Sequence, residues 1–159
     1  GTIGGSSANN DPAADYLSAI LALDATIVTD KRSIPADKFF KGLFETSLKE
    51  GEIVTAIEFT APAKAAYSKF PNPASRYAMT GVFVAKQKDG ARVAVTGAGD
   101  DGVFRHKGLE AALNKKFAAD ALDGVAVASK GLMSDMHASA DYRAALIKVM
   151  AKRAVAAAG

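Results

Sequence analysis

Residues 67–96 read YSKFPNPASRYAMTGVFVAKQKDGARVAVT. Their β-branched and aromatic side chains predict strands over Tyr67–Phe70 and Arg76–Lys86, with a proline-containing loop between them. Residues 88–90, Lys-Asp-Gly, are typical of a hairpin turn, so residues 91–96 are expected to return antiparallel to the strand before them. The stretch therefore predicts a three-stranded antiparallel meander.

Helices are predicted after the meander. The sequence favours helices over Leu109–Lys116 and from Ala118 to about Lys130, followed by a long helix from Ser139, a suitable N-cap, to about Ala157. One stripe of that last helix is expected to comprise Tyr142, Leu146, Val149 and Arg153. Because the strands come first and the helices after them, we predict an α+β unit with helices packed on one face of the sheet.

Shorter elements are predicted before the meander. Asp11 is expected to cap a helix that has Pro12 at its first position and runs to Asp24. Strands are expected over residues 25–29 and 53–59. Side chains predicted to face the core are Phe39, Phe40 and Phe44 of a short amphipathic turn or helix over residues 36–44, and Ile53, Ile57 and Phe59 of the second strand. The small, proline-containing stretch 60–63 predicts a boundary between domains over residues 1–60 and 61–159.

The composition is that of a globular protein, with 49% apolar and 23% charged residues. No apolar run approaches the roughly eighteen residues that span a bilayer, and no secretory segment is evident, so we expect a cytoplasmic protein without a membrane span. The absence of cysteine excludes disulfides and an iron–sulfur cluster held by cysteines of this chain. His106 and His137 have no neighbouring metal ligands, and we predict no metal site.

Charge is distributed unevenly along the chain. Residues 1–60 carry five Lys/Arg and nine Asp/Glu, whereas residues 61–159 carry fifteen and eight. The cations of the second part are scattered, without a basic run or interleaved aromatics, so nucleic-acid binding is not expected. A solvated face or a surface that docks on an acidic partner fits this pattern better.

Residues 2–6, Thr-Ile-Gly-Gly-Ser, are the best candidate for a phosphate-binding segment. A glycine pair allows positive φ and close approach of main-chain amides to an anion. The positive end of the helix expected at Asp11 would face this turn, and the Asp15 carboxylate would be free to accept from ribose or ribityl hydroxyls. The alternative is a plain structural turn, which the same composition also permits.

Residues 97–102, Gly-Ala-Gly-Asp-Asp-Gly, match a dinucleotide-binding pattern and suggest a nicotinamide-binding module. Asp100 and Asp101 would repel a pyrophosphate, and the residues after Gly102 do not begin a helix. The strand before the pattern belongs to a hairpin instead of a βαβ unit. The pattern is therefore the weaker of the two cofactor hypotheses.

The order of the N-terminal residues is more specific than their composition. Thr-Ile-Gly-Gly-Ser followed by Asp-Pro-Ala-Ala-Asp-Tyr at 11–16 resembles the second flavin segment of the FAD-carrying medium subunit of molybdenum hydroxylases, the carbon monoxide dehydrogenase and xanthine dehydrogenase family. Several later segments of this chain resemble the C-terminal domain of that subunit: residues 67–70, 75–78, 94–99 and 141–146, and Lys-Arg-Ala at 152–154. The resemblance thus covers nearly the whole chain.

The resemblance implies a set of FAD-binding residues. Thr2, Ile3, Gly4, Gly5 and Ser6 would wrap the diphosphate and ribityl chain, and Asp15 would bond the hydroxyls of the flavin chain. Val54 would line the adenosine side, Lys69 would approach the flavin, and Tyr77 would lie beside the isoalloxazine. Residues 1–60 would then be the end of a flavin-binding α/β domain.

The resemblance also implies an oxidoreductase subunit. Electrons would pass from a molybdenum-binding large subunit through a [2Fe-2S] small subunit to FAD, and from FAD to an external acceptor. The first flavin segment of the family is not found in this sequence, and the chain starts without Met, so we expect the downstream part of a longer protein that binds FAD weakly alone and is inactive by itself. The alternative is a non-enzymatic α+β module that docks subunits and binds no cofactor.

Overall fold

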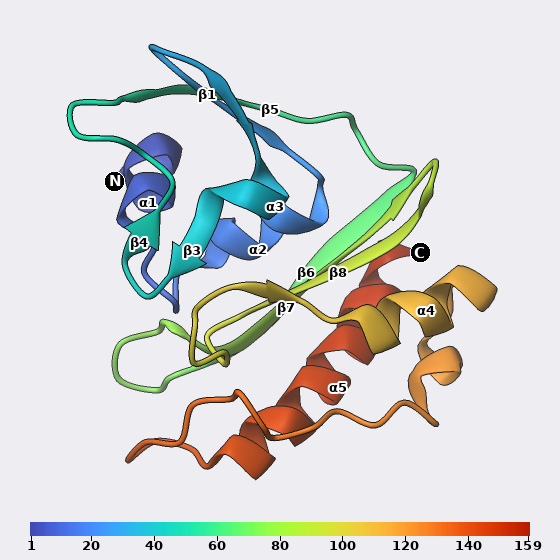
Figure 1. Ribbon diagram of the computed structural model, residues 1–159. Helices are drawn as coiled ribbons and strands as arrows, with labels where there is room; N and C mark the ends of the chain where they lie inside the picture. Colours follow the sequence, from blue (N-terminus) through green and yellow to red (C-terminus); the bar gives the residue numbers. More distant parts are fainter.

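The computed structural model describes residues 1–159 and is built around a four-stranded antiparallel sheet (Figure 1). Its strands are β6 (Lys64–Pro71), β7 (Ala78–Gln87), β8 (Gly90–Thr96) and β9 (Phe104–Arg105), in that order across the sheet. Tyr67 pairs with Phe83, and Val82 pairs with Val95. The predicted meander is confirmed, and β9 adds a short fourth strand at its edge.

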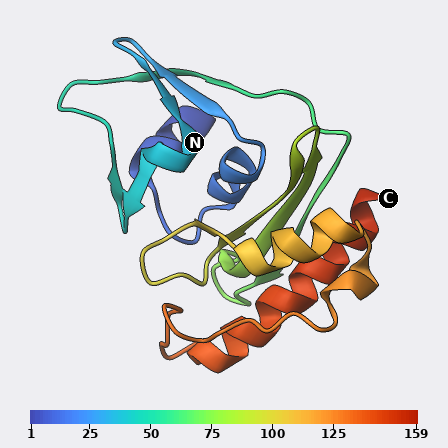
Figure 2. The same ribbon diagram turned by 45° about the vertical axis from the view of Figure 1, so that its right-hand side comes forward.

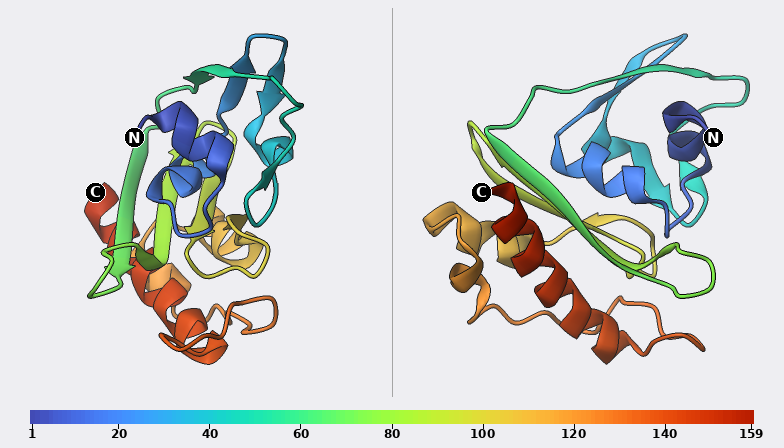
Figure 3. Two further views of the ribbon diagram at one scale, coloured as in Figure 1. Left: turned by 90° about the vertical axis from the view of Figure 1, so that its left-hand side faces the viewer. Right: turned by 180° about the vertical axis from the view of Figure 1, so that it is seen from behind.

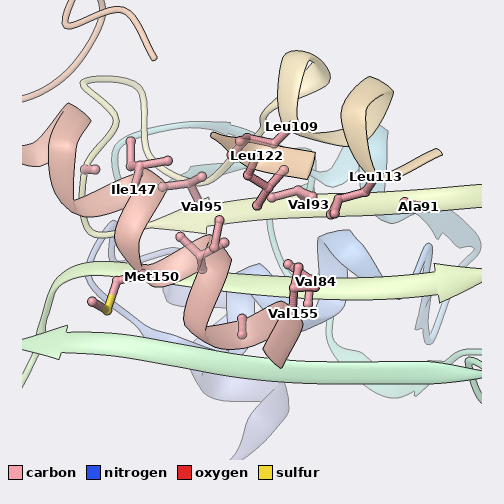
Figure 4. Packing of buried hydrophobic residues seen from close by; sticks show 14 of the residues in the cluster. Val84, Ala91, Val93, Val95, Leu109, Leu113, Leu122, Ile147, Met150 and Val155 are labelled. Carbon is pink, nitrogen blue, oxygen red and sulfur yellow. The ribbon is translucent and has the colours of Figure 1, made fainter. Parts of the chain in front are cut away.

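One face of this sheet is covered by helices from the second part of the chain. Helices α4 (Lys107–Lys115) and α5 (Ala140–Ala158) pack there, together with the short 3-10 helix η1 (Ala119–Leu122). Figure 4 shows Val84, Val93 and Val95 of the sheet meeting Ile147 and other side chains of these helices. The cluster contains 16 buried residues, so it is the larger of the two cores. The helices of residues 61–159 therefore lie on one face, as predicted.

The opposite face of the sheet is covered by the first part of the chain. Ala85 and Ala94 point to this side and join Ile20 and Leu21 of helix α2 (Asp15–Ala22) in a second cluster of 10 buried residues. Figure 2 shows the resulting layers, with the sheet between the first part and helices α4 and α5. The first part thus completes its core with side chains of the second.

The remaining elements of the first part are short. Two short helices lie around α2, namely α1 (Ile3–Asn9) and the single turn of α3 (Ala36–Phe39). A three-stranded sheet has the order β2 (Ser33–Pro35), β1 (Thr26–Thr29), β5 (Val54–Glu58). Strands β3 (Phe40–Gly42) and β4 (Glu45–Thr46) form a hairpin. Figure 3 shows these elements from two further sides, on one side of the central sheet. Phe39 is fully buried and Ile57 packs against the same core, as expected.

Three side chains predicted for this core are exposed instead. Phe44, Ile53 and Phe59 are 61%, 65% and 55% exposed. Phe44 lies in the β3–β4 turn with φ of 55° because the buried Asn10 side chain donates to the carbonyls of Gly42 and Glu45 on either side of it, both at 2.7 Å. That tertiary contact determines the turn, and the helix expected over residues 36–44 ends at Phe39.

The predicted helix start at Asp11 is also wrong. Asp11 Oδ1 accepts the amide of Ala13 at 2.9 Å, and the Pro12 carbonyl accepts the amide of Gly97 at 2.7 Å and the hydroxyl of Thr96 at 2.9 Å. This turn is tied to the end of β8, so helix α2 begins only at Asp15.

Of the two further C-terminal helices predicted, one needs correction and one is confirmed. The helix expected from Ala118 to Lys130 is limited to η1, because Gly124 follows it and Val125 and Val127 pack against the core from a segment without regular secondary structure. Helix α5 is confirmed, with the Ser139 hydroxyl accepting the amide of Tyr142 at 3.2 Å.

The buried face of α5 differs from the predicted stripe. Tyr142, Val149 and Arg153 are exposed, and only Leu146 of that stripe is buried. The face against the sheet comprises Arg143, Ile147, Met150, Ala151, Ala154 and Val155. Several of these residues are alanines, which allow close approach to the sheet but give a weak periodic signal in a helix that is rich in alanine throughout.

Candidate functional site

The N-terminal glycine pair lies in the first turn of α1. Neither Gly4 nor Gly5 has positive φ, so the expected left-handed glycine turn is wrong. Thr2 is the N-cap, and its hydroxyl accepts the amide of Gly5 at 3.0 Å, which favours helix over a tight turn. The amides of Ile3 and Gly4 have no acceptor within the chain. They remain available to a ligand.

Val54 is brought next to this segment. It is the first residue of β5, and a Cβ added at Gly4 would lie 3.7 Å from Val54 Cγ1. Helix α1 packs against β5, so residues 50 positions apart in sequence form one surface. The structure therefore places two of the predicted site residues in contact.

Asp15 and Lys69 form the second group. Asp15 is the first residue of α2, and Lys69 lies on β6, on the sheet face that α2 covers. Lys69 Nζ donates to Asp15 Oδ2 at 2.8 Å. The Asp15 side chain is 45% exposed, so its carboxylate is paired and still reaches solvent. The sequence predicted a free carboxylate, whereas the structure shows one held by a cation.

Tyr77 joins this second group through the β6–β7 loop. Lys69 Nζ also donates to the carbonyl of Arg76 at 3.2 Å, and the amide of Asn72 donates to the carbonyl of Tyr77 at 2.8 Å. The Tyr77 side chain is exposed and lines a cavity of about 240 Å³ with Asp11. Tyr77 thus lines a cavity, and its loop is bonded to Lys69, although neither Asp15 nor Lys69 lines that cavity.

Tyr67 belongs to the same group, although the sequence analysis did not select it. Its hydroxyl donates to Asp15 Oδ1 at 2.5 Å. Burial, followed by the hydrogen bond to Asp15, raises the pKa of Tyr67 well above its ordinary value. A tyrosine in a predicted strand reads as a packing residue, so only its two-residue spacing from Lys69, which places both on one face, could have indicated this role.

The glycine-rich segment 97–102 forms no dinucleotide site. Gly97 and Gly102 have φ of 78° and 95°, and the chain continues into β9 antiparallel to β8. A phosphate-binding turn of this type needs a following helix in a βαβ unit, which is not present. The nicotinamide hypothesis therefore has no structural support.

No cluster of three potential metal ligands occurs. His106 caps α4, its Nδ1 accepting the amide of Leu109 at 3.2 Å, and burial lowers its pKa. Its role is therefore structural. None of the helices has the length and apolar character needed to cross a bilayer.

Comparison with known proteins gives one consistent answer. Residues 1–62 match the family described as the FAD binding domain in molybdopterin dehydrogenase. The carbon monoxide dehydrogenase medium chain of Hydrogenophaga pseudoflava is 32% identical over 99% of this chain and 60% of its own length. The glyceraldehyde dehydrogenase medium chain of Sulfolobus acidocaldarius is 33% identical over 97% and 60%. The first 62 residues thus match an FAD-binding domain, and nearly the whole chain is similar to medium chains of this kind.

Structural similarity to this family extends over both parts of the chain. The solved carbon monoxide dehydrogenase from Hydrogenophaga pseudoflava that lacks the Mo-pyranopterin moiety of the molybdenum cofactor superposes with a TM-score of 0.82 at 32% identity. The match covers 99% of this chain and 60% of the solved chain. The chain therefore spans about three fifths of the length of the relatives that it matches.

The exposed groups of the candidate site fit FAD. A carboxylate that reaches solvent accepts hydrogen bonds from ribityl or ribose hydroxyls, as Asp15 does from Tyr67 and Lys69. Main-chain amides without acceptors, as at Ile3 and Gly4, suit phosphate oxygens. The exposed ring of Tyr77 can stack on a planar heterocycle. These groups thus suit the hydroxyls, the phosphates and the planar ring of the cofactor.

Proposed function

We propose that this chain is the FAD-binding part of a medium subunit that passes electrons within a molybdenum hydroxylase. The electrons would come from a molybdenum-binding large subunit through a [2Fe-2S] small subunit, and FAD would deliver them to an external acceptor. The observation that carries this proposal is the match of 99% of the chain to a carbon monoxide dehydrogenase medium chain. The cellular location proposed from the sequence is the cytoplasm.

Two surfaces of the chain would hold the cofactor. Thr2, Ile3, Gly4, Gly5 and Ser6 would contact the diphosphate and ribityl chain, with Val54 beside Gly4 on the adenosine side. The backbone of glycine residues permits close approach of a ligand, and Gly5 is exposed. This assignment predicts that a side chain added at Gly5 weakens FAD binding.

Asp15, Lys69 and Tyr77 would act on the other side. Asp15 would accept from flavin-chain hydroxyls while the ion pair with Lys69 holds the carboxylate in place. The Lys69 ammonium would also place positive charge near the flavin, and Tyr77 would cover one side of the isoalloxazine. FAD supplies the redox chemistry when it is bound, and these residues bind, orient and shield it.

The first experiment measures FAD binding by visible flavin absorbance and fluorescence quenching. It compares the chain alone with the chain co-expressed with the part of the Hydrogenophaga pseudoflava medium chain that lies outside the match. We expect one FAD per chain in the complemented protein, and weaker binding by the chain alone. Asp15→Asn should weaken binding by about tenfold to a hundredfold, since a charge-assisted hydrogen bond contributes about 1.5–3 kcal/mol.

The matched control is Asp141→Asn. Asp141 is a carboxylate in the first turn of α5, on the opposite face of the sheet, and its replacement should leave FAD affinity unchanged. A complemented protein that stays colourless would contradict the proposal and favour the subunit-docking module that binds no cofactor.

A further inference from the structure

Tyr67 is fixed between the two parts of the molecule. It lies on β6, and its ring stacks on Phe83 of β7 with centroids 6.4 Å apart and 26° between the planes. Its hydroxyl crosses to α2 and donates to Asp15 Oδ1 at 2.5 Å. The phenol is therefore held by the sheet while its polar end contacts the first residue of the helix that covers the sheet.

Gly81 provides the space for this phenol. It lies opposite Lys69 on β7, and a Cβ at this position would lie 2.2 Å from Tyr67 Oη and 2.9 Å from Cε2 and Cζ. Gly81 does not have positive φ, so the glycine is needed for space and not for backbone conformation. Glycine in the interior of a strand is otherwise unfavourable. The absence of a side chain at Gly81 thus leaves the space that the Tyr67 ring occupies.

We propose that Tyr67 is a positioning residue that orients the Asp15 carboxylate for the hydroxyls of bound FAD. This inference rests on the proposed function, which assigns those hydroxyls to Asp15. Tyr67 Oη occupies one site on Oδ1 and Lys69 Nζ one site on Oδ2. Each carboxylate oxygen accepts about two hydrogen bonds, so each keeps a free lone pair for the ligand.

Tyr67 and Lys69 differ in rigidity, which gives the tyrosine the positioning role. Lys69 has a flexible four-carbon stem and shares its ammonium between Asp15 and the Arg76 carbonyl. Tyr67 is confined by Phe83 and by the close approach to Gly81. A donor that is fixed before the ligand arrives removes the ordering cost from binding.

The protonation of Tyr67 is consistent with this role. Burial raises its pKa, and the hydrogen bond to Asp15 raises it further, so the hydroxyl keeps its proton at neutral pH. Asp15 therefore always faces a donor. In the Asp15→Asn variant the carboxylate contribution is absent, and the pKa of Tyr67 should fall.

The binding test compares Tyr67→Phe with Tyr142→Phe in the preparation that binds FAD. Tyr67→Phe keeps the stacked ring and loses only the donor, and we expect FAD affinity to fall about three- to tenfold. Tyr142 is exposed on α5 and packs edge-on against Phe70, so Tyr142→Phe should bind FAD as the unmodified protein does. In the double variant Tyr67→Phe/Asp15→Asn, the loss should not exceed that of Asp15→Asn alone.

A second readout needs no flavin. Tyrosinate absorbance of the chain alone should rise equally in the unmodified protein and in Tyr67→Phe through the ordinary tyrosine range near pH 10, because Tyr67 stays protonated. Burial remains in Asp15→Asn, so Tyr67 of this variant should ionise above the ordinary tyrosine range but at a lower pH than in the unmodified protein, and Tyr67→Phe/Asp15→Asn should lack that ionisation. Gly81→Ala, which pushes the phenol away, should weaken FAD binding as Tyr67→Phe does.

The outcomes separate the two proposals. If Asp15→Asn weakens FAD binding while Tyr67→Phe and Gly81→Ala do not, the positioning role of Tyr67 is wrong and the proposed function stands. If Asp15→Asn leaves FAD binding unchanged, the assignment of the hydroxyls to Asp15 is wrong. Circular dichroism melts of each variant show whether a lost affinity reflects unfolding instead.

Discussion

The two parts of the chain are stabilised in different ways. Residues 61–159 contain a sheet with strands of up to ten residues, a helix of 19 residues and a core of 16 buried residues. Residues 1–60 contain strands of at most five residues, and their core of 10 buried residues includes Ala85 and Ala94 from the sheet. The first part therefore depends on the second, whereas the core of the second is complete within its own residues.

This difference bears on the site. Asp15 lies on an element that the sheet supports, and Tyr67 and Lys69 are the sheet residues that bond to it. The candidate binding surface thus lies where the dependent part meets the self-contained one. Changes that loosen the first part should affect FAD binding before they affect the rest of the fold.

Phe39→Ala should cause the largest loss of stability, and it should affect the first part of the chain more than the second. Phe39 is fully buried in the smaller core, and its truncation costs about 3–5 kcal/mol. Hydrogen exchange should accelerate over residues 26–58, while amides of α5 remain protected.

Ile147→Ala is the matched variant in the larger core. Ile147 is also fully buried, and its truncation costs about 2–5 kcal/mol. Because α2 packs on the same sheet, exchange should accelerate in both parts. Equal acceleration across the whole chain in both variants would show that the two parts unfold together.

Arg92→Met should have an intermediate effect on the contact between the parts. Arg92 of β8 is largely buried, donates to the Leu21 carbonyl at 3.0 Å and pairs with Asp24 and Asp37, both at 2.9 Å. The Leu21 carbonyl then lacks the guanidinium donors, so the free energy of unfolding measured in urea should fall by about 1–3 kcal/mol. The exposed Arg153 is the control, and Arg153→Met should change stability by less than about 0.5 kcal/mol.

The sequence predicted the second part better than the first for a physical reason. Period-two strands, the Lys-Asp-Gly turn and the Ser139 cap are local signals, and the structure confirms all three. Asp11 and Phe44 were misassigned because bonds from Gly97 and Asn10, distant in sequence, determine their conformation. Local patterns do not contain that information.

The candidate site follows the same rule. The order of residues in the first segment indicated the resemblance to FAD-binding medium subunits, which secondary-structure propensity alone could not have indicated. Tyr67 and Asp15 are 52 positions apart in sequence, and their hydrogen bond forms only because α2 packs on the sheet. Gly81, within a strand of apolar residues, was the one signal of a close approach.

A pH change should give the smallest effect and should act on the first part. The buried Glu52 carboxylate accepts from Arg32 and from the Lys49 amide, both at 2.8 Å, and the Arg32 bond is the main cause of a pKa lowered from 4.5 to about 2. A lowered folded-state pKa adds stability above pH 4.5 that is lost as the pH falls toward 2.

Urea unfolding at pH 7 and pH 3 measures this contribution. Glu52→Gln removes the titrating group, so the variant should lose less stability than the unmodified protein between the two pH values. An identical pH dependence in the two proteins would show that Glu52 is not the group responsible.

The central claim is that FAD binds across α1 and the Asp15–Lys69–Tyr77 group, and amide NMR tests it most directly. FAD is added to the isotope-labelled chain, complemented by the unlabelled part of the Hydrogenophaga pseudoflava medium chain that lies outside the match. We predict that resonances of residues 2–6, Asp15, Lys69 and Tyr77 shift while those of residues 97–102 do not. Shifts confined to residues 97–102, or no shifts at all, would contradict the account.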